Sequence, residues 1–454
     1  MMGPQPVPGP KGRWPFGSLP ALRRDVLGFF ESLARDYGPV AQVPVMGGSF
    51  YALMQPEPIE EVLVRQAGSF IKSKDYRSDL DFLGRGLLTS DGEAWLRQRR
   101  LMQPAFHHKR IAAYSETMVT LTEELAAGWQ DGQELDLHAD MMRLTFEIVA
   151  QALLGADVSA DAVDVGRALK LFMMQATTEG SLLKAFLPNT LPTPGNLRRK
   201  RMRQRLDAMI YRIIRDRHQG EDQGDLLSML LAARDEDGSG MSETQIRDEL
   251  LTIVLAGHET TANALSWTLH LLSRHPGALR LLEDELAAVL GGRAPTVADL
   301  PRLPMTEKVI KESMRLYPPV WSIGREAARD VEVAGYRLPK GAQVYLFQWT
   351  VHRDERFYED PLVFRPERWN GELEKRLPRF AYFPFGGGHR MCIGAGFAQM
   401  EARLLLASLA QRYRFRELPG HPVELQPSIT LRPKHGLRML LEARKDAEGA
   451  ASSP

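Results

Sequence analysis

Cys392 is the only cysteine in the 454-residue sequence, and it lies in the segment Phe385-Gly-Gly-Gly-His-Arg-Met-Cys-Ile-Gly394. A single thiol cannot form an intrachain disulfide, but its thiolate can be one axial ligand to a metal. Apolar residues at helical spacing follow, so Cys392 precedes a predicted helix N-terminus, where the helix dipole stabilises negative charge. The glycines permit tight bends and a close approach to a flat cofactor. A buried, inert cysteine is the alternative for this residue taken alone.

A second candidate segment, Ala256-Gly-His-Glu-Thr-Thr261, lies inside a long helical pattern. Ser242 begins a predicted capping box, and the pattern runs to Pro276, which gives about 30 helical residues, or roughly 45 Å. The two small residues that open the segment leave space beside the helix. The Thr260 hydroxyl can donate to the preceding turn, and Glu259 can carry protons inward from solvent. A purely structural Glu–Thr pair is the alternative.

The cysteine segment matches the pattern F-x-x-G-x-R-x-C-x-G at Phe385, Gly388, Arg390, Cys392 and Gly394. On this match the chain resembles the cytochrome P450 family of haem-thiolate enzymes. The segment from Ala256 to Thr261 is similar to the family's A/G-G-x-D/E-T-T/S motif at every defined position. The resemblance spans roughly residues 20 to 443. It implies the cytochrome P450 fold, which is mainly α with small β-sheets.

The resemblance also implies a haem b cofactor between the long helix and the Cys392 loop. Cys392 would be the metal ligand, and Phe385 and Gly394 would contact the cofactor. Glu259 and Thr260 would form the catalytic proton relay. Guanidinium and indole N–H groups suit the two haem propionates. The candidates for propionate binding are Trp95, Arg99, Arg325 and Arg390.

Glu312 and Arg315 share a helix face because they are three residues apart, before Tyr317-Pro-Pro319. Most such pairs are weak surface ion pairs. These two resemble the family's E-x-x-R element, whose third member would be Arg368 in Phe364-Arg-Pro-Glu-Arg368. A buried Arg–Glu–Arg cluster needs mutual hydrogen bonds to offset its desolvation. We therefore expect a structural role for all three residues.

The substrate pocket, by analogy of position, is expected to be lined by residues from three segments. They are Phe82, Leu83, Val254, Ala256, Thr260, Val320, Trp321 and Ile323, with Phe172, Met173 and Met174 as a lid. Such walls suit a fatty acid, terpenoid or steroid-like molecule. The segment from Asp81 to Leu87 resembles the corresponding loop of fatty-acid-hydroxylating P450s, which slightly favours a fatty acid. Core packing is the alternative for Met and Phe residues at helical spacing.

The resemblance predicts a monooxygenase that inserts one oxygen atom of O2 into an apolar substrate. Electrons would come from a separate ferredoxin or flavodoxin, because the chain has no room for a flavin or iron–sulfur domain. A candidate docking surface, here called the basic patch, consists of Arg97, Arg100, His107, His108, Lys109 and Arg110. Ordinary surface charge is the alternative.

Two other functions stay open at this point. One is a P450-fold enzyme that uses peroxide or rearranges its substrate without oxygen, which an intact Glu259–Thr260 pair disfavours. The other is a non-catalytic haem-thiolate sensor or ligand-binding protein.

The charges nearly balance, with 58 Lys and Arg against 57 Asp and Glu, and give no reason to expect a nucleic-acid partner. The basic run at residues 198–205 indicates a solvated helix face. No stretch of about 18 apolar residues occurs, so we expect a cytoplasmic protein without a membrane anchor. We expect tails at residues 1–20 and 444–454 around one domain at residues 21–443.

Apolar spacing predicts helices over residues 22–37, 58–66, 114–129, 137–154 and 196–218. It predicts a hairpin of residues 40–46 and 49–54 around Gly47-Gly48. A second strand pair is predicted within residues 331–345, around Pro339-Lys-Gly341. Polar loops are expected at residues 219–224 and 235–240. Helical patterns therefore dominate the chain.

Overall fold

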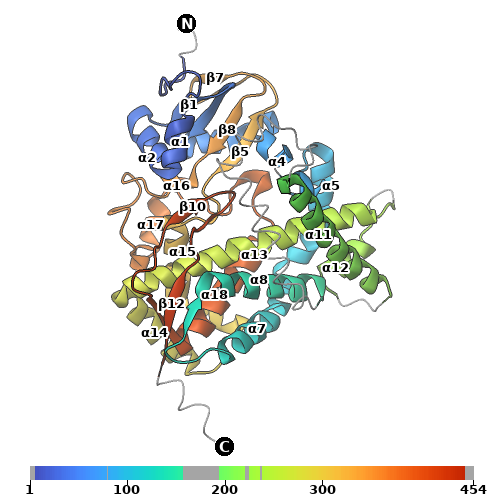
Figure 1. The fold of residues 1–454 in the computed structure, drawn as a ribbon, viewed down its shortest axis with the longest axis vertical. Helices are drawn as coiled ribbons and strands as arrows, with labels where there is room; N and C mark the ends of the chain where they lie inside the picture. The colour runs from blue at the N-terminus through green and yellow to red at the C-terminus, as the bar shows by residue number, and fades with distance from the viewer. Residues whose placement is uncertain (1–5, 79, 157–193, 220–223, 236–237, 445–454) are drawn as a thin grey trace, which may run out of the picture.

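The computed structural model describes residues 6–78, 80–156, 194–219, 224–235 and 238–444. Long helices make up most of this part of the chain, and the largest sheet lies at one end (Figure 1). The predicted class, mainly α with small β-sheets, is confirmed. The predicted lid residues Phe172, Met173 and Met174 lie outside the described residues.

The α-helices of the described residues are α1 (Leu19–Arg24), α2 (Val26–Tyr37), α3 (Pro56–Glu60), α4 (Lys74–Ser78), α5 (Gly92–Met102), α6 (His108–Ala113), α7 (Ser115–Ala127), α8 (Leu137–Leu154), α11 (Pro194–Gln219), α12 (Leu226–Ala232), α13 (Glu243–Arg274), α14 (Pro276–Leu290), α15 (Pro304–Leu316), α16 (Gln348–Val351), α17 (Glu372–Arg376) and α18 (Ala395–Arg412). Short turns of other helix types are η1 (Glu61–Arg65), η2 (Ala67–Ser69), η3 (Asp81–Leu83), η4 (Gln103–Phe106), η5 (Val297–Arg302), η6 (Pro366–Arg368) and η7 (Gly388–Arg390).

Most predicted helices are present with small shifts at their ends. The helix predicted over residues 137–154 has the bounds of α8. The one predicted over residues 22–37 is broken into α1 and α2 at Asp25, which is extended and accepts a hydrogen bond from the Gly28 N–H at 3.0 Å. An Asp side chain competes with the helix in this way and favours a new N-terminus.

The largest sheet has the strand order β1-β2-β8-β5-β3. Its strands are β1 (Val40–Val45), β2 (Gly48–Leu53), β8 (Gln343–Leu346), β5 (Ile323–Ala327) and β3 (Phe70–Lys72). The predicted first hairpin is confirmed as β1 and β2. A three-stranded sheet contains β4 (Glu134–Asp136), β12 (Arg438–Ala443) and β9 (Tyr413–Glu417), and β10 (Leu425–Pro427) pairs with β11 (Leu431–Pro433).

The second predicted strand pair is wrong in its partners. β6 (Val331–Val333) pairs with β7 (Tyr336–Leu338) across Ala334 and Gly335, both of which have positive φ. Two such residues form the tight turn that suits the twist of a hairpin. The segment after Gly341 becomes β8 and enters the large sheet between β2 and β5.

Helix α13 crosses the middle of the molecule (Figure 1). The predicted N-cap is present, since Ser242 Oγ accepts from the Gln245 N–H at 3.2 Å. At Gly257 a Cβ would lie 2.9 Å from Val149 Cγ2 on α8, so this glycine permits close packing of the two helices. Helix α18 packs against the same long helix and follows directly on the Cys392 loop. The core therefore forms around α13, with α8 and α18 beside it.

The segment predicted as an N-terminal tail is ordered in its described part. Gly17 forms a bridge with Val45 at the end of β1, and the Pro8 carbonyl accepts from the Gln42 N–H at 2.8 Å. Residues 8–17 thus add hydrogen bonds to the outer edge of the large sheet.

No helix within the described ranges is both long and apolar enough to cross a bilayer.

Candidate functional site

The Cys392 loop is a tight turn held against η1. Gly386 and Gly388 have positive φ, and a Cβ at Gly388 would lie 2.0 Å from the Leu63 carbonyl oxygen. No side chain fits there without moving the backbone. The Cys392 N–H donates to the Phe385 carbonyl at 3.0 Å and closes the loop. These contacts fix where the thiol points.

The Cys392 thiol lies at a cavity of about 310 Å³. Ala256, Gly257 and Thr260 on α13 line the same cavity. The Cys392 side chain is accessible from the cavity and has protein on its other sides, and this partial burial raises the pKa of its thiol, while the Gly394 backbone N–H and then the charge of Arg99 act in the opposite direction. The predicted approach of the long helix and the cysteine loop is thus present in the structure.

Thr260 and Glu259 point to different surroundings. The Thr260 hydroxyl lies at the cavity and donates to the Ala256 carbonyl at 2.7 Å, as the sequence predicts. Glu259 is 2% exposed and is not among the cavity-lining residues. Its carboxylate accepts a hydrogen bond from the Thr430 hydroxyl at 2.5 Å. The two members of the predicted relay are therefore neighbours in sequence that face different elements.

The four predicted propionate-binding residues, Trp95, Arg99, Arg325 and Arg390, all line the cavity. The Arg390 guanidinium lies 4.4 Å from the centre of the Trp95 ring and donates to Asp91 at 2.5 Å. Arg99 Nη1 donates to the Met391 carbonyl at 2.9 Å. The loop of Cys392 and helix α5 are thereby tied together.

Lys72 is a cavity-lining cation that sequence reasoning missed. It stands opposite Arg325 where β3 pairs with β5. Burial first, and then the charges of Arg325 and Arg390, hold the pKa of Lys72 well below its usual value. Burial also lowers the pKa of Arg325, to about 10. Buried cations that repel one another are stabilised by an anionic ligand.

The donor set fits a haem. A cysteine side chain can ligate iron, the walls are largely apolar, and a group of cations faces the cavity where two carboxylates would relieve their mutual repulsion. Phe385 and Gly394, the residues expected to contact the cofactor, also line the cavity.

The apolar wall of the cavity contains some of the residues expected in the substrate pocket and not others. Ala256, Val320 and Ile323 line the cavity, as expected. Phe82, Leu83, Val254 and Trp321 are not among the residues that line it. Leu87, Leu88 and Ile253 take their places.

Local structure explains why these four side chains lie away from the cavity. Phe82 and Leu83 turn into the core at η3 and are almost fully buried. Val254 is one residue, and hence about 100° of helix rotation, away from Ile253. Trp321 turns the other way, packs beside Phe347 and donates its indole N–H to the Ser428 carbonyl at 2.7 Å.

Two acids at the start of α13 hold the loop that carries Leu87 and Leu88. Asp248 accepts from the Arg85 N–H at 2.7 Å, and Glu249 accepts from the Leu87 N–H at 2.8 Å. Glu249 is fully buried, and burial raises its pKa to about 8. The cavity wall is thus fixed by backbone hydrogen bonds to α13.

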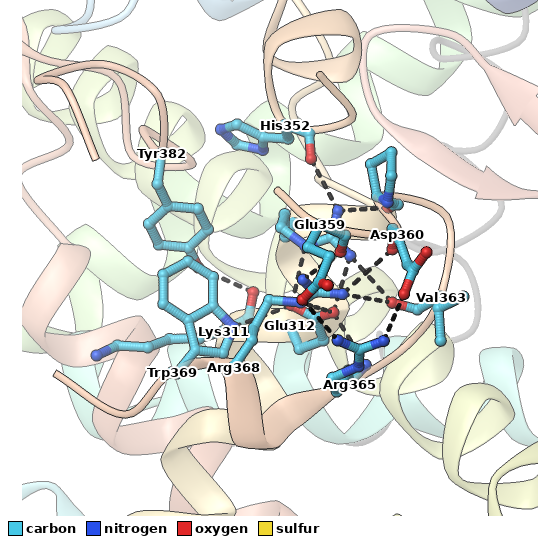
Figure 2. A network of polar contacts seen from close by, with 12 residues as sticks. Lys311, Glu312, His352, Glu359, Asp360, Val363, Arg365, Arg368, Trp369 and Tyr382 are labelled. Carbon is cyan, nitrogen blue, oxygen red and sulfur yellow. Dashed lines mark hydrogen bonds and ion pairs between the residues drawn. The ribbon is translucent and has the colours of Figure 1, made fainter. Parts of the chain in front are cut away.

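Glu312, Arg315 and Arg368 form a buried cluster (Figure 2). Both nitrogens of one edge of Arg315 reach the Glu312 carboxylate at 2.8 and 2.9 Å, and Arg368 Nε reaches it at 2.9 Å. The Trp369 indole adds a further donor at 3.0 Å. Carbonyls of residues 352, 359–361 and 363 accept from the two guanidinium groups. None of the three lines the Cys392 cavity.

Glu401 on α18 is a second residue that the sequence analysis did not single out. It is fully buried, neither carboxyl oxygen has a hydrogen-bond partner within 3.5 Å, and burial raises its pKa to about 8. Thr261, which lines the cavity, is the one side chain that opposes this shift. A glutamate inside an apolar helical stripe, between Met400 and Leu404, is the sequence signal that could have identified it.

Four residues of the basic patch, Arg100, His107, Lys109 and Arg110, line a hollow in the surface near the cysteine loop. Arg99 lines both this hollow and the Cys392 cavity, and Leu96 is 57% exposed at the hollow. Arg97 and Arg100 both pair with Asp235, at 2.6 Å each. The positive charge of the patch is therefore partly neutralised within the molecule.

The fold consists mainly of long helices, and its site is a cavity with a cysteine in the wall. Together these features define one class of enzyme. A family model described as Cytochrome P450 matches residues 7–439. The chain belongs to the cytochrome P450 family.

Curated relatives and solved structures agree with this assignment. The chain is 38% identical to cyclooctatin synthase of Streptomyces melanosporofaciens, over 93% of this chain and 92% of that one. It is 35% identical to pentalenene oxygenase of Streptomyces avermitilis, over 93% and 94%. Among solved structures, the cytochrome P450DA heme domain superposes with a TM-score of 0.87 at 27% identity, covering 98% of this chain and 99% of that one.

A third relative, cyclooctat-9-en-7-ol 5-monooxygenase of Streptomyces melanosporofaciens, is 34% identical over 90% of this chain and 92% of its own length. With such relatives the chain is a P450 monooxygenase. Membership of the family implies haem-iron binding, the use of O2 and a substrate, and a source of electrons.

Proposed function

We propose that this enzyme binds haem b and inserts one oxygen atom of O2 into a terpenoid-like, largely apolar substrate, with electrons from a separate ferredoxin or flavodoxin. The observation that carries the proposal is that Cys392 and Thr260 line one apolar cavity that also bears a group of buried cations. A thiolate ligand, a distal alcohol and propionate-binding cations are the three requirements of the haem-thiolate site.

Cys392 would ligate the iron, and Lys72, Trp95, Arg99, Arg325 and Arg390 would hold the propionates. When bound, haem supplies the activation of O2 and the transfer of oxygen. Thr260 would hold water and a transferable proton at the cavity, because its hydroxyl is fixed at 2.7 Å from the Ala256 carbonyl. Glu259, one residue away, would supply protons to it. Glu312, Arg315 and Arg368 would serve the fold.

The substrate class rests on the cavity wall and on the relatives. Leu87, Leu88, Ile253, Val320 and Ile323 form the aliphatic part of a wall that also contains aromatic residues, and such a wall suits an apolar hydrocarbon skeleton. Two relatives carry terpenoid-derived names, cyclooctatin synthase and pentalenene oxygenase. Together these observations favour a terpenoid over the fatty acid that the loop before Trp95 suggested.

The proposal for the electron donor rests on the position of the basic patch. The hollow of the basic patch adjoins the cysteine loop through Arg99, so an acidic partner seated there would be close to the iron ligand. A cytoplasmic location and the lack of a nucleic-acid partner belong to the same proposal. The near-zero net charge supports the second of these.

The test has two stages. In the first, carbon monoxide is added to dithionite-reduced protein, and we expect a red-shifted Soret band in the wild type that Cys392→Ser lacks. In the second, the enzyme is given O2, NADPH and a surrogate ferredoxin system with panels of cyclic terpenes, terpene alcohols and fatty acids. Hydroxylated terpenes support the proposal. A wild-type spectrum without turnover of any terpene, but with turnover of fatty acids, would reject the substrate class.

A further inference from the structure

The hydrogen bonds of Glu259 lead away from the cavity toward the β10–β11 hairpin. Thr430 lies just before β11, is 4% exposed and donates its hydroxyl to Glu259 Oε1 at 2.5 Å. A buried carboxylate with one short O–H donor is well anchored, since hydrogen bonds to charged groups are the stronger kind. Thr430 is therefore the group that determines where the Glu259 side chain lies.

Thr430 is itself held by a residue of α13. Asn263, four residues after Glu259 and so on the same helix face, donates Nδ2–H to the Thr430 oxygen at 3.3 Å. The Asn263 carbonyl oxygen lies 2.9 Å from His138 Nε2 on α8. Asn263 is fully buried, whereas His138 is half-buried. A series of hydrogen-bonded side chains thus runs from Glu259 through Thr430 and Asn263 to the edge of the core.

This series of hydrogen bonds orients the side chains of Thr430 and Glu259, but it does not conduct protons through Asn263. The donation from Asn263 fixes the Thr430 oxygen as an acceptor, so its single hydrogen is left for Glu259. A carboxamide passes on a proton only through a high-energy tautomer. The arrangement therefore controls the position and ionisation of Glu259.

Two groups near Glu259 favour its ionised form. Burial raises the pKa of Glu259, and the Thr430 hydrogen bond and then the charge of Arg432 lower it. Arg432 lies on β11 and is 6% exposed. His258, the neighbouring residue, has its pKa lowered to about 4 by burial and is neutral near pH 7. The hairpin thus supplies both influences that favour the ionised form.

We propose that Thr430 is a positioning residue for Glu259, which it holds in one orientation and keeps ionisable, so that Glu259 can lose and regain a proton in each turnover. The inference rests on the proposed role of Glu259 in proton delivery. No bond other than O–H bonds is made or broken in this step, and solvent replaces the proton that is delivered. Because the hydroxyl stabilises the carboxylate form, its removal favours the protonated acid.

The decisive measurement is a pH titration of the Glu259 carboxyl by infrared difference spectroscopy on the ferric holoenzyme, with the band assigned by Glu259→Gln. We expect Thr430→Val to raise the midpoint by about one pH unit and Thr430→Ser to restore it. Ser428→Ala, a hydroxyl deletion on the same hairpin that leaves the Glu259 donor intact, should leave the midpoint unchanged. If Thr430→Val does not fold, Thr430→Ala serves in its place.

An unchanged midpoint without the Thr430 hydroxyl, or an equal shift in Ser428→Ala, would overturn the proposal. A second measurement, the fraction of consumed electrons that ends in product, separates the proposal for Thr430 from the proposed role of Glu259 in proton delivery. We expect Thr430→Val to divert about tenfold more O2 to peroxide and Thr430→Ser to recover coupling. Normal coupling in Glu259→Gln would reject proton delivery by Glu259, while the titration would still decide whether Thr430 positions that acid.

Discussion

Gly257 on α13 approaches Val149 on α8 so closely that a Cβ would stand 2.9 Å from Val149 Cγ2. The missing side chain of this glycine therefore serves helix packing. Valine is stiff at χ1 and cannot easily move away. We expect Gly257→Ala to lower the free energy of unfolding by about 1–3 kcal/mol through overpacking.

Urea unfolding followed by circular dichroism measures this change. Gly277→Ala on α14 is the matched control, because a Cβ there meets nothing within 4 Å. A stable Gly257→Ala variant, indistinguishable from Gly277→Ala, would show that the α8–α13 contact can relax.

Lys72 should matter for cofactor retention rather than for folding. Its ammonium is buried beside Arg325, where it can pair with a propionate. We expect Lys72→Met to release haem about tenfold faster, which corresponds to about 1.4 kcal/mol. Transfer of haem to excess apomyoglobin measures the rate. Lys74→Met, an exposed lysine two residues on, should retain haem at the wild-type rate.

Arg368 should be essential for stability. Its removal leaves the buried Glu312 carboxylate short of one charged partner (Figure 2). We expect Arg368→Met to destabilise the fold by about 3–5 kcal/mol, or to prevent folding. Arg365→Met is the matched control, since Arg365 pairs with Asp360 at the surface and should cost less than about 1 kcal/mol. Equal losses in the two variants would contradict the structural role of the cluster.

Glu401 should make stability depend on pH. Its pKa is about 8 in the folded protein against an ordinary value of 4.5, so between these values the folded state holds a proton that the unfolded state has lost. Stability must therefore fall as the pH rises through this window, by up to about 1.4 kcal/mol per unit. Glu401→Gln cannot ionise and should remove this component of the fall.

Urea unfolding at pH 5 and pH 8.5 tests the prediction. Relative to the wild type, Glu401→Gln should gain stability at the higher pH, whereas Glu372→Gln at an exposed site of α17 should not. A constant difference between Glu401→Gln and the wild type at both pH values would mean that Glu401 does not hold the extra proton.

Lys109 is the best place to test the donor surface. It is exposed and lines the hollow beside the cysteine loop, while Arg100 is paired with Asp235. We expect Lys109→Glu to raise the KM for a ferredoxin severalfold and to weaken its salt dependence, because one attractive charge becomes repulsive. Lys375→Glu on α17, at the opposite side in Figure 1 from α5, is the control. Unchanged donor kinetics for Lys109→Glu would move the docking site elsewhere.

The sequence predicts those parts of the site whose signal is local. The cysteine loop, the Ala256–Thr261 segment and the helix that carries Trp95 and Arg99 each have their own spacing, and all three meet at the cavity. Ile253 was missed because a choice between adjacent helix positions needs the orientation of α13. Lys72 has no local signal, since its place depends on the pairing of β3 with β5, remote in sequence. The sequence pairs Glu259 with its neighbour Thr260, and only the fold reveals the contact of Glu259 with Thr430.

The contacts between the cysteine loop and the N-terminal half join residues that are synthesised far apart in time. Arg390 donates to the Ser90 carbonyl, and these residues are 300 positions apart. Cys392, the proposed iron ligand, leaves the ribosome long after the residues that face it, and β12 must still pair with β4 behind it. A nascent chain that stops before residue 392 has α13 and the cavity-lining cations, but it lacks Cys392 and the whole of α18. Haem capture is therefore expected to begin only when synthesis is almost complete, so that haem supply and release of the finished chain limit the yield of active enzyme together.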